Sequence, residues 1–425
     1  MIVSKSKKMM QTSFEKTLYR FMEVPKPVFD GHFGIYIHVP FCISKCSFCP
    51  FYKELFSEKL KEQYLDAISK EIDDTDMQGK AEWMYFGGGT PNTLTIEDIY
   101  QIVERIRGKV EISSVGIELL PGILSEEYLK GLKAIGFTKI SIGVESFFDE
   151  VINKTGRIVT TYERVAELVE FAKSLGLWVN VDMMVSLPNQ GANAFRHDIR
   201  RISTILPDQI TIYPFMIIRG LKATPGSTPR QQFELIEEAD DTLKRLGYAR
   251  KGVWTFALGD DIYDSSRDEL IEDYLGFGPA AFSTYGNWKV VNPELDVYIR
   301  NMQSAKRMGF VATKTKASDE WRKFARMVYD LKVDNTCNLP SYIRIFIWLL
   351  KVAGYIEHGI LDGKGRIFAH EITKTVVESL PFPVQNPSCV ENYDEYVSYK
   401  RVNECVTSLH PKYIPETIRS HSRLV

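Results

Sequence analysis

Three cysteines, Cys42, Cys46 and Cys49, stand close together in the stretch YIHVPFCISKCSFCPF at residues 36–51. The whole chain contains six cysteines, so half of them lie in this one segment. Thiolates are soft ligands, and three of them suit either a zinc ion or an iron–sulfur cluster. A zinc site needs a fourth ligand, for which His38 is the nearest candidate. A four-iron cluster held by three cysteines instead keeps one iron open for another ligand.

The composition sets the context in which these thiols work. The chain has 425 residues, a net charge of −2, 44% hydrophobic and 12% aromatic residues, which excludes a disordered chain and gives no sign of a nucleic-acid partner. The sequence contains no run of about 18 apolar residues, so we expect no transmembrane helix. The basic N-terminus has no apolar stretch typical of a secretory signal. We therefore expect a cytoplasmic protein, in which clustered cysteines bind metal or act in catalysis rather than form disulfides.

The elements that position the cysteines follow a regular alternation of short apolar strands and longer helices. Six strands are predicted, each followed by a helix, at residues 33–40, 82–89, 113–121, 138–146, 177–188 and 208–215. Repeated strand–helix units require parallel strands with right-handed crossovers. The pattern predicts an α/β fold, either a doubly wound sheet or a barrel of six units. In both, the loops at the carboxyl ends of the strands form the active site, and the cysteines lie on the first such loop.

The domain prediction has four parts. They are an N-terminal arm at 1–32, the strand–helix core at 33–250, a segment at 251–310 that closes the catalytic domain, and a C-terminal helical or winged-helix-like domain with its tail at 311–425. The winged-helix reading rests on a small β-ribbon expected over residues 360–370. The last 40 or so residues are polar, and we expect them to be only partly ordered.

The motif YIHVPFCISKCSFC resembles the C-x3-C-x2-C loop of radical S-adenosylmethionine (SAM) enzymes. Its Tyr-x-His-x-Pro-Phe portion resembles the family of oxygen-independent coproporphyrinogen III oxidase, the HemN-like family. Four more segments resemble that family in order, at residues 85–94, 139–157, 179–188 and 274–283. The resemblance implies a partial (β/α)6 barrel of the radical SAM type with a smaller, mostly helical C-terminal domain.

The resemblance also implies the cofactors and the residues that hold them. A [4Fe-4S] cluster would be bound by Cys42, Cys46 and Cys49. SAM, in one or two molecules, would chelate the open iron and be cleaved reductively to methionine and a 5′-deoxyadenosyl radical that abstracts hydrogen. The SAM-binding residues implied are Tyr36, Phe48, Gly87, Gly88, Gly89, Thr90, Glu118, Glu145, Arg157 and Asp182.

Four of these assignments carry specific roles. By resemblance the glycine backbone meets the methionine amino group, and Arg157 holds the methionine carboxylate. Glu145 accepts hydrogen bonds from the ribose hydroxyls, where the family more often has Gln. Asp182 stands within the apolar strand VNVDMMV, where an unpartnered carboxylate would cost several kcal/mol, and the resemblance makes the ribose its partner. No catalytic side chain for the substrate is assigned.

The reaction itself remains open between several classes. Val159 and Phe282 stand where the family often has histidine, and we therefore favour class C methyl transfer to a planar, unsaturated or aromatic substrate. The alternatives are coproporphyrinogen-type decarboxylation, anaerobic haem degradation, and a non-catalytic haem chaperone. A flavodoxin or ferredoxin is the expected electron donor. Cys337, Cys389 and Cys405 form no second motif.

A set of aromatic side chains predicts where the substrate binds. They belong to a pocket that we expect between the barrel mouth and the region of residues 251–370, although an ordinary domain interface has the same composition. The set is Trp254, Phe256, Tyr274, Phe277, Phe282, Tyr285 and Trp288.

Overall fold

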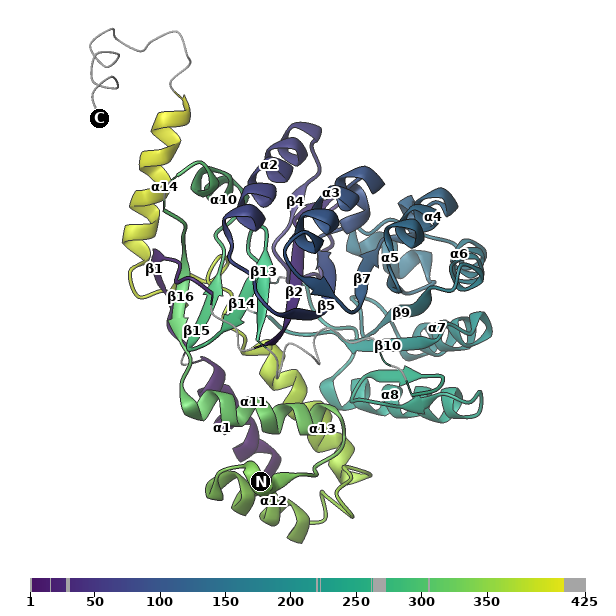
Figure 1. Cartoon of the computed structure of the whole chain (residues 1–425). Coiled ribbons are helices and arrows are strands. Elements are labelled where there is room, and N and C mark those ends of the chain that lie inside the picture. Colours follow the sequence, from purple (N-terminus) through teal and green to yellow (C-terminus); the bar gives the residue numbers. More distant parts are fainter. Residues whose placement is uncertain are drawn as a thin grey trace, which may run out of the picture.

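The structure is a computed structural model and describes residues 2–15, 17–27, 31–218, 221, 223–260, 262, 273–304 and 306–408. A single large sheet dominates it, with helices covering its outer face (Figure 1). Among the described residues this sheet has 14 strands, and its order from one edge to the other is β1-β16-β15-β14-β13-β2-β5-β7-β8-β9-β10-β12-β11. The short β6 (Glu111–Ile112) also pairs with β5.

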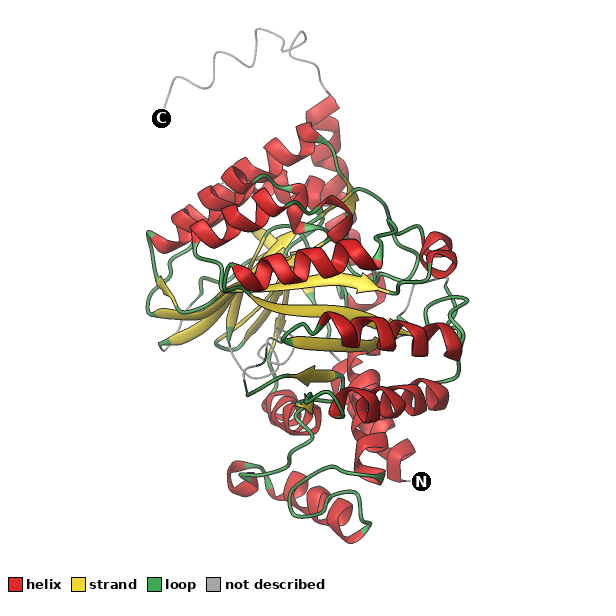
Figure 2. Cartoon of the chain, turned by 90° about the vertical axis from the view of Figure 1, so that its right-hand side faces the viewer, coloured by secondary structure: helices red, strands yellow, loops and turns green. Residues whose placement is uncertain are grey.

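Six neighbouring strands in the middle of the sheet run parallel to one another. They are β2 (His32–Val39), β5 (Lys80–Gly88), β7 (Val115–Leu119), β8 (Lys139–Glu145), β9 (Trp178–Val185) and β10 (Gln209–Pro214). The helices between and after them are α2 (Glu58–Asp74), α3 (Ile96–Arg107), α4 (Glu126–Ile135), α5 (Asp149–Thr155), α6 (Tyr162–Ser174), α7 (Ala192–Ile205) and α8 (Pro229–Lys244). The predicted α/β fold with six strand–helix units is confirmed. Figure 2 shows the helices lying outside the curved sheet.

The sheet continues past β2 through the segment that was expected to close the catalytic domain. β13 (Tyr274–Phe277) pairs parallel with β2. Three antiparallel strands follow it, namely β14 (Phe282–Tyr285), β15 (Trp288–Val291) and β16 (Met308–Thr313), and α10 (Leu295–Met302) connects the last two. β1 (Arg20–Glu23), from the N-terminal arm, forms the outer edge. At the opposite edge, β12 (Thr255–Ala257) and β11 (Ala249–Arg250) pair antiparallel with the sheet.

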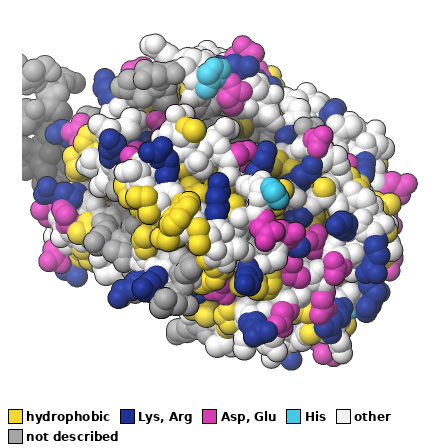
Figure 3. Space-filling view, turned by 90° about the horizontal axis from the view of Figure 1, so that it is seen from below, with side chains coloured by type: hydrophobic (Ala, Val, Ile, Leu, Met, Phe, Trp, Pro, Cys, Tyr) yellow, Lys and Arg dark blue, Asp and Glu magenta, His cyan; other side chains and the backbone are white. Residues whose placement is uncertain are grey.

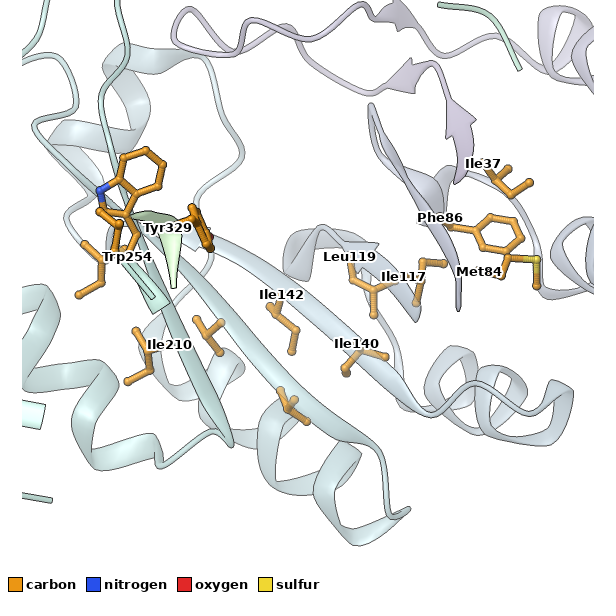
Figure 4. Packing of buried hydrophobic residues seen from close by; sticks show 14 of the residues in the cluster. Ile37, Met84, Phe86, Ile117, Leu119, Ile140, Ile142, Ile210, Trp254 and Tyr329 are labelled. Atoms are coloured by element: carbon orange, nitrogen blue, oxygen red, sulfur yellow. The ribbon is translucent and has the colours of Figure 1, made fainter. Parts of the chain in front are cut away.

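The core explains why the strands read as continuous apolar runs. Side chains from successive strands, including Ile37, Phe86, Ile117, Ile140 and Ile210, are fully buried in one large hydrophobic cluster. Figure 4 shows these residues spread across neighbouring strands of the sheet. Parallel strands covered on both faces need apolar residues at nearly every position. The few polar residues on these strands are therefore candidates for function.

Local helix signals agree with the structure. Thr95 accepts a hydrogen bond from the Asp98 backbone amide, and the Asp98 carboxylate accepts one from the Thr95 amide, which makes a capping box at the start of α3. Gly136 ends α4 with φ +99°, a left-handed conformation that glycine adopts without a Cβ penalty. The capping box therefore fixes where the loop before α3 ends, and Gly136 fixes where the loop from α4 to β8 begins.

The C-terminal part of the chain is helical. It contains α11 (Lys316–Tyr329), α12 (Ser341–Val352), α13 (Lys364–Glu378) and α14 (Tyr393–Ser408), and α1 (Ile2–Glu15) contacts α11 and α13. The β-ribbon predicted over residues 360–370 is wrong, because α13 begins at Lys364. Phe368, Ile372 and Val376 recur at helical spacing on its buried side. In the described part of the chain, no helix combines the length and the apolar character that a membrane crossing requires.

Candidate active site

A cavity of about 540 Å³ extends along the inner face of the sheet. The carboxyl ends of the parallel strands form one end of it, and α11, α13 and residues 380–385 form another wall. Most of the residues singled out from the sequence line this cavity, namely Tyr36, Cys42, Cys46, Phe48, Cys49, Gly88, Gly89, Thr90, Glu118, Glu145, Arg157 and Asp182. Gly87 is the exception, although a Cβ there would lie 3.1 Å from the Glu118 carboxylate.

The cysteine loop leaves β2 through a short strand, β3 (Phe41–Cys42), that pairs with β4 (Glu54–Leu55). Cys42 is buried, Cys46 and Cys49 are half-buried, and all three thiols are free. The Thr90 hydroxyl lies 3.5 Å from the Cys42 sulfur. No group of three His, Cys, Asp or Glu side chains in the described part of the chain is placed to hold a single metal ion. Burial raises the pKa of the Cys42 and Cys46 thiols, and Arg157 opposes this effect at Cys46.

The glycine-rich segment after β5 packs directly against the cysteine loop. The Gly89 amide donates to the Val39 carbonyl at 2.7 Å, and the Thr90 amide donates to the Phe41 carbonyl at 2.7 Å. Gly88 has φ +104°, and a Cβ there would lie 2.6 Å from the His38 ring. A Cβ at Gly89 would lie 2.6 Å from the Phe41 carbonyl oxygen. Side chains at these two positions would therefore push the segment away from the thiols.

His38 is held inside the protein and is not free to act as a fourth zinc ligand. Its Nε2 donates to the Tyr52 carbonyl at 3.1 Å, and its Nδ1 lies 3.3 Å from the Tyr36 hydroxyl, an arrangement that fits the neutral ring. Burial lowers the pKa of His38 to about 4. Both ring nitrogens are engaged in these contacts, so neither is available to a zinc ion. The cysteine spacing is compatible with a zinc site or an iron–sulfur cluster, and the position of His38 favours the cluster.

Two carboxylates, Glu118 and Glu145, enter the cavity from adjacent strands. Glu118 accepts a hydrogen bond from the Tyr85 hydroxyl at 2.8 Å, and burial raises its pKa to about 7. Glu145 ends β8 at a register shift and has φ +68°, a conformation that costs energy for a residue with a Cβ. Burial raises the pKa of Glu145 to about 7, while the nearby Arg157 opposes the shift.

Arg157 links the second carboxylate to the cysteine loop. Its guanidinium lies 3.5 Å from Glu145 Oε1 and also donates to the Gly143 carbonyl. Its positive charge also acts on Cys46, where it favours the thiolate form. Because Arg157 follows Gly156, which ends α5 with φ +76°, the chain turns sharply enough to bring this side chain back to the strand ends. The guanidinium of Arg157 lies in the region between the Cys46 thiol and the Glu145 carboxylate. A planar cation of this kind is suited to bind the carboxylate of a ligand there.

Asp182 finds its hydrogen-bond partners within the protein. Its carboxylate accepts from the Ser141 hydroxyl at 2.5 Å and from the Asn180 side-chain amide at 2.8 Å. Sequence reasoning required a partner for this carboxylate but missed Ser141 and Asn180. Both could have been found, because each is a polar residue in an otherwise apolar strand.

Further from the thiols the cavity becomes largely apolar. Of the seven aromatic residues expected there, Trp254, Tyr274 and Phe282 line it, whereas the other four do not. The apolar lining is completed by residues that sequence reasoning did not identify, namely Met184, Tyr213, Met216, Ile218, Tyr329, Ile372, Val376, Val377, Leu380 and Phe382. Phe282 packs edge-on against Phe382, with ring centroids 5.8 Å apart.

Three cations, Lys53 beside the cysteine loop, Lys289 on β15 and Arg322 on α11, also line the cavity and were not predicted. Among the described residues no side-chain hydrogen bond or ion pair joins the Lys289 ammonium to a partner. Burial lowers the pKa of Lys289 to about 8, and the positive charge of Arg322 adds to this effect. Arg322 lies 3.6 Å from Asp319. The Asp319 carboxylate opposes the lowering of the Lys289 pKa only in part, and a partly buried ammonium gains further stability when an anion joins it.

Cys337 and Cys389 are not among the residues that line the cavity. Cys337 is exposed, and Cys389 is buried with its sulfur 3.0 Å from the Asn386 carbonyl oxygen. The side chain of Cys405 lies outside the described residues.

Comparison with known proteins places this arrangement in context. A profile described as the radical SAM superfamily matches residues 36–202. Oxygen-independent coproporphyrinogen III oxidase from Synechocystis is 26% identical over 293 residues, which cover 64% of this chain and 63% of that protein. Heme chaperone HemW from Haemophilus influenzae is 30% identical over 265 residues, which cover 58% of this chain and 69% of that protein. The chain thus spans less than two thirds of the oxidases that it matches.

One solved structure matches most of the fold. Coproporphyrinogen III oxidase (HemN) from Escherichia coli, described as a radical SAM enzyme, aligns with a TM-score of 0.69 at 21% identity and covers 87% of this chain and 92% of its own. Radical SAM proteins work with a [4Fe-4S] cluster and SAM. The residues present fit these groups, because three free thiols, a glycine backbone and polar side chains face one cavity.

Proposed function

We propose that this chain, which belongs to the HemN-like family of the radical SAM superfamily, is an enzyme that cleaves SAM reductively in this cavity. One observation carries the proposal. The three thiols, the glycine segment and Arg157 meet at one end of a cavity whose other part is apolar. Hydrogen abstraction requires that the cofactor and the substrate bind next to each other in one cavity that excludes water, and this cavity offers a place for each.

Cys42, Cys46 and Cys49 are proposed to hold the [4Fe-4S] cluster. When bound, the cluster supplies the low-potential electron that splits SAM into methionine and the radical that abstracts hydrogen. Thr90 fixes Cys42 through its hydroxyl, and Arg157 stabilises the anionic form of Cys46. A flavodoxin or ferredoxin is the proposed source of the electron.

SAM is proposed to bind against the strand ends beside these thiols. The backbone of the Gly87–Gly89 segment and Glu118 would meet the methionine amino group, because carbonyl and carboxylate oxygens attract an ammonium. Arg157 would hold the methionine carboxylate. Glu145 and Asp182 would accept bonds from the ribose hydroxyls. Tyr36 and Phe48 supply apolar contact at the edge of the site.

The substrate is proposed to be a planar or unsaturated molecule with an apolar body. The wall formed by Trp254, Phe282, Ile372 and Val376 excludes water and suits such a body. The positive charges of Lys289 and Arg322 favour a substrate that carries an acidic group. We expect this group at the end of the substrate that does not contact the apolar wall.

Methyl transfer is the reaction we propose for this substrate. Phe282, where the family often has histidine, lines the cavity, and Val159 packs in the same small cluster as Phe48 and Met184. Both departures replace a polar ring beside the reacting region with a hydrocarbon, which supports altered chemistry relative to decarboxylation. Oxidative decarboxylation and haem ring-opening are the competing reactions.

A haem chaperone is the competing function of another class. His38 is the one histidine among the described residues that line the cavity. Its two nitrogens are hydrogen-bonded within the protein, and we therefore rank axial haem ligation in this cavity below catalysis.

The discriminating experiment is anaerobic turnover with SAM labelled at its methyl group, with candidate substrates supplied. Methyl transfer predicts 5′-deoxyadenosine together with S-adenosylhomocysteine, and label in the product. Deoxyadenosine without the homocysteine product, while a substrate is consumed, would assign decarboxylation instead. Tight haem binding with no SAM cleavage would assign the chaperone function.

A further inference from the structure

Helix α12 (Ser341–Val352) is apolar around nearly its whole circumference, but only one side of it is buried. Ile343, Ile347 and Leu350 pack into the core. The opposite side exposes large apolar residues, of which Trp348 is 59% and Val352 68% exposed. The exposed set is Tyr342, Ile345, Trp348, Leu349 and Val352. A helix that is apolar on all sides is normally covered on all sides. We therefore expect the exposed face of α12 to contact a binding partner.

The charges on α12 indicate the chemistry of that partner. Arg344 and Lys351 are the charged residues of the helix, both are exposed, and both are positive. At 100° per residue they fall together on one flank of the exposed apolar stripe, next to Trp348. Figure 3, which views the molecule from below, the side on which α12 lies in Figure 1, shows hydrophobic side chains gathered there with Lys and Arg around them.

The N-terminal helix adds positive charge at the same end of the molecule. Both α1 and α12 lie at the lower end in Figure 1 and Figure 2. Lys5 and Lys8 of α1 are exposed, and the described side chains of this helix include no acidic residue. An apolar stripe containing Trp and Tyr, bordered by cations, is the pattern of helices that lie in the plane of an anionic membrane surface.

A second copy of the chain fits this surface less well. Pairing two α12 helices antiparallel about their centres would bring Arg344 of one copy against Lys351 of the other, and would repeat this repulsion by symmetry. An anionic lipid surface instead satisfies both cations and covers the apolar stripe.

We propose that this end of the protein binds anionic membrane surfaces, with α12 lying in the interface and its Tyr342–Val352 stripe inserted among the lipids. Arg344 and Lys351 contact the headgroups, and the lysines of α1 add long-range attraction. The α12 helix lies between α11 and α13 in the chain, and these two helices wall the cavity. Membrane contact therefore involves the domain that also encloses the proposed substrate.

The test is co-sedimentation of the full chain with vesicles of phosphatidylcholine alone and of phosphatidylcholine with 30% phosphatidylglycerol. We expect binding to the anionic vesicles that weakens with salt, and much weaker binding to the neutral ones. Replacing Ile345 and Trp348 with Ser should reduce binding about tenfold or more. Arg344→Gln with Lys351→Gln should reduce it about fivefold per charge. The matched control, Tyr100→Ser with Leu246→Ser, removes two exposed apolar side chains elsewhere and should bind like wild type.

Three results would overturn the proposal. One is equal binding to neutral and anionic vesicles, and another is undiminished binding by the Ile345/Trp348 variant. The third is a dimer in light scattering that the same variant dissolves, with no vesicle binding by wild type, which would assign the stripe to a second copy. Because the replaced residues are exposed, thermal melting of each variant should match that of the wild type.

Discussion

The Arg157 guanidinium lies 3.5 Å from the Glu145 carboxylate, and a bulge at the end of β8 brings the two side chains together. The positive charge of Arg157 also favours the thiolate form of Cys46, so one cation acts on both the proposed cluster site and the proposed SAM site. We expect Arg157→Ala to weaken SAM binding about tenfold to a hundredfold, since a lost charge-assisted bond costs roughly 1.5–3 kcal/mol. Calorimetric titration of the reconstituted protein measures this.

The matched control is Arg164→Ala. Arg164 belongs to α6, is not part of the cavity lining, and lies 3.3 Å from the carboxylate of Glu167. This variant should bind SAM like wild type. Wild-type affinity in Arg157→Ala, with the iron content unchanged, would show that this arginine does not hold SAM.

Asp182 gives a second, independent test of the same site. Asp182→Ala should weaken SAM binding to a similar degree while the cluster stays in place, because the carboxylate is proposed to accept the ribose hydroxyls. Ser141→Ala keeps the carboxylate but removes the bond of 2.5 Å that orients it, and should have a smaller effect. If Ser141→Ala weakened SAM binding and Asp182→Ala did not, the carboxylate would be structural.

Gly88 is predicted to tolerate no side chain. Its φ of +104° and the contact of 2.6 Å between an added Cβ and the His38 ring should make Gly88→Ala destabilising by roughly 2–4 kcal/mol. Gly259 has φ +86° with open space around an added Cβ, so Gly259→Ala isolates the backbone cost of about 1 kcal/mol. Denaturant unfolding compares the two. Equal destabilisation would mean that the His38 contact is unimportant.

Glu118 predicts a pH dependence of stability. Its pKa in the folded protein is raised to about 7 from 4.5, so the folded state binds more protons than the unfolded state between these values. The free energy of unfolding of the cofactor-free protein should therefore fall as pH rises from about 4.5 to 7. In Glu118→Gln the free energy of unfolding should fall less over this pH range, and the difference from the wild type should be about 3 kcal/mol at most. Urea unfolding at several pH values measures it, and parallel curves for both proteins would contradict the prediction.

The sequence allows the architecture and one end of the site to be predicted, for physical reasons. Apolar runs such as VNVDMMV identify buried parallel strands, and the spacing of Cys42, Cys46 and Cys49 identifies a soft metal site. Lys289 and Arg322 could not be found in this way, because they meet only when β15 and α11 pack together. The β-ribbon predicted over residues 360–370 is wrong because Gly363 and Gly365, which are poor helix formers, stand at the start of α13.

The central claim is that the three cysteines support reductive cleavage of SAM. The most direct measurement is the yield of 5′-deoxyadenosine after anaerobic reconstitution with iron and sulfide, reduction with dithionite and addition of SAM. We expect a four-iron cluster and 5′-deoxyadenosine with an equal amount of methionine from the wild type. Cys46→Ala should give neither cluster nor cleavage, while its circular dichroism stays that of the folded protein, since the core lies elsewhere. Zinc without sulfide in protein purified anaerobically, or a complete cluster with bound SAM and no 5′-deoxyadenosine, would contradict the claim.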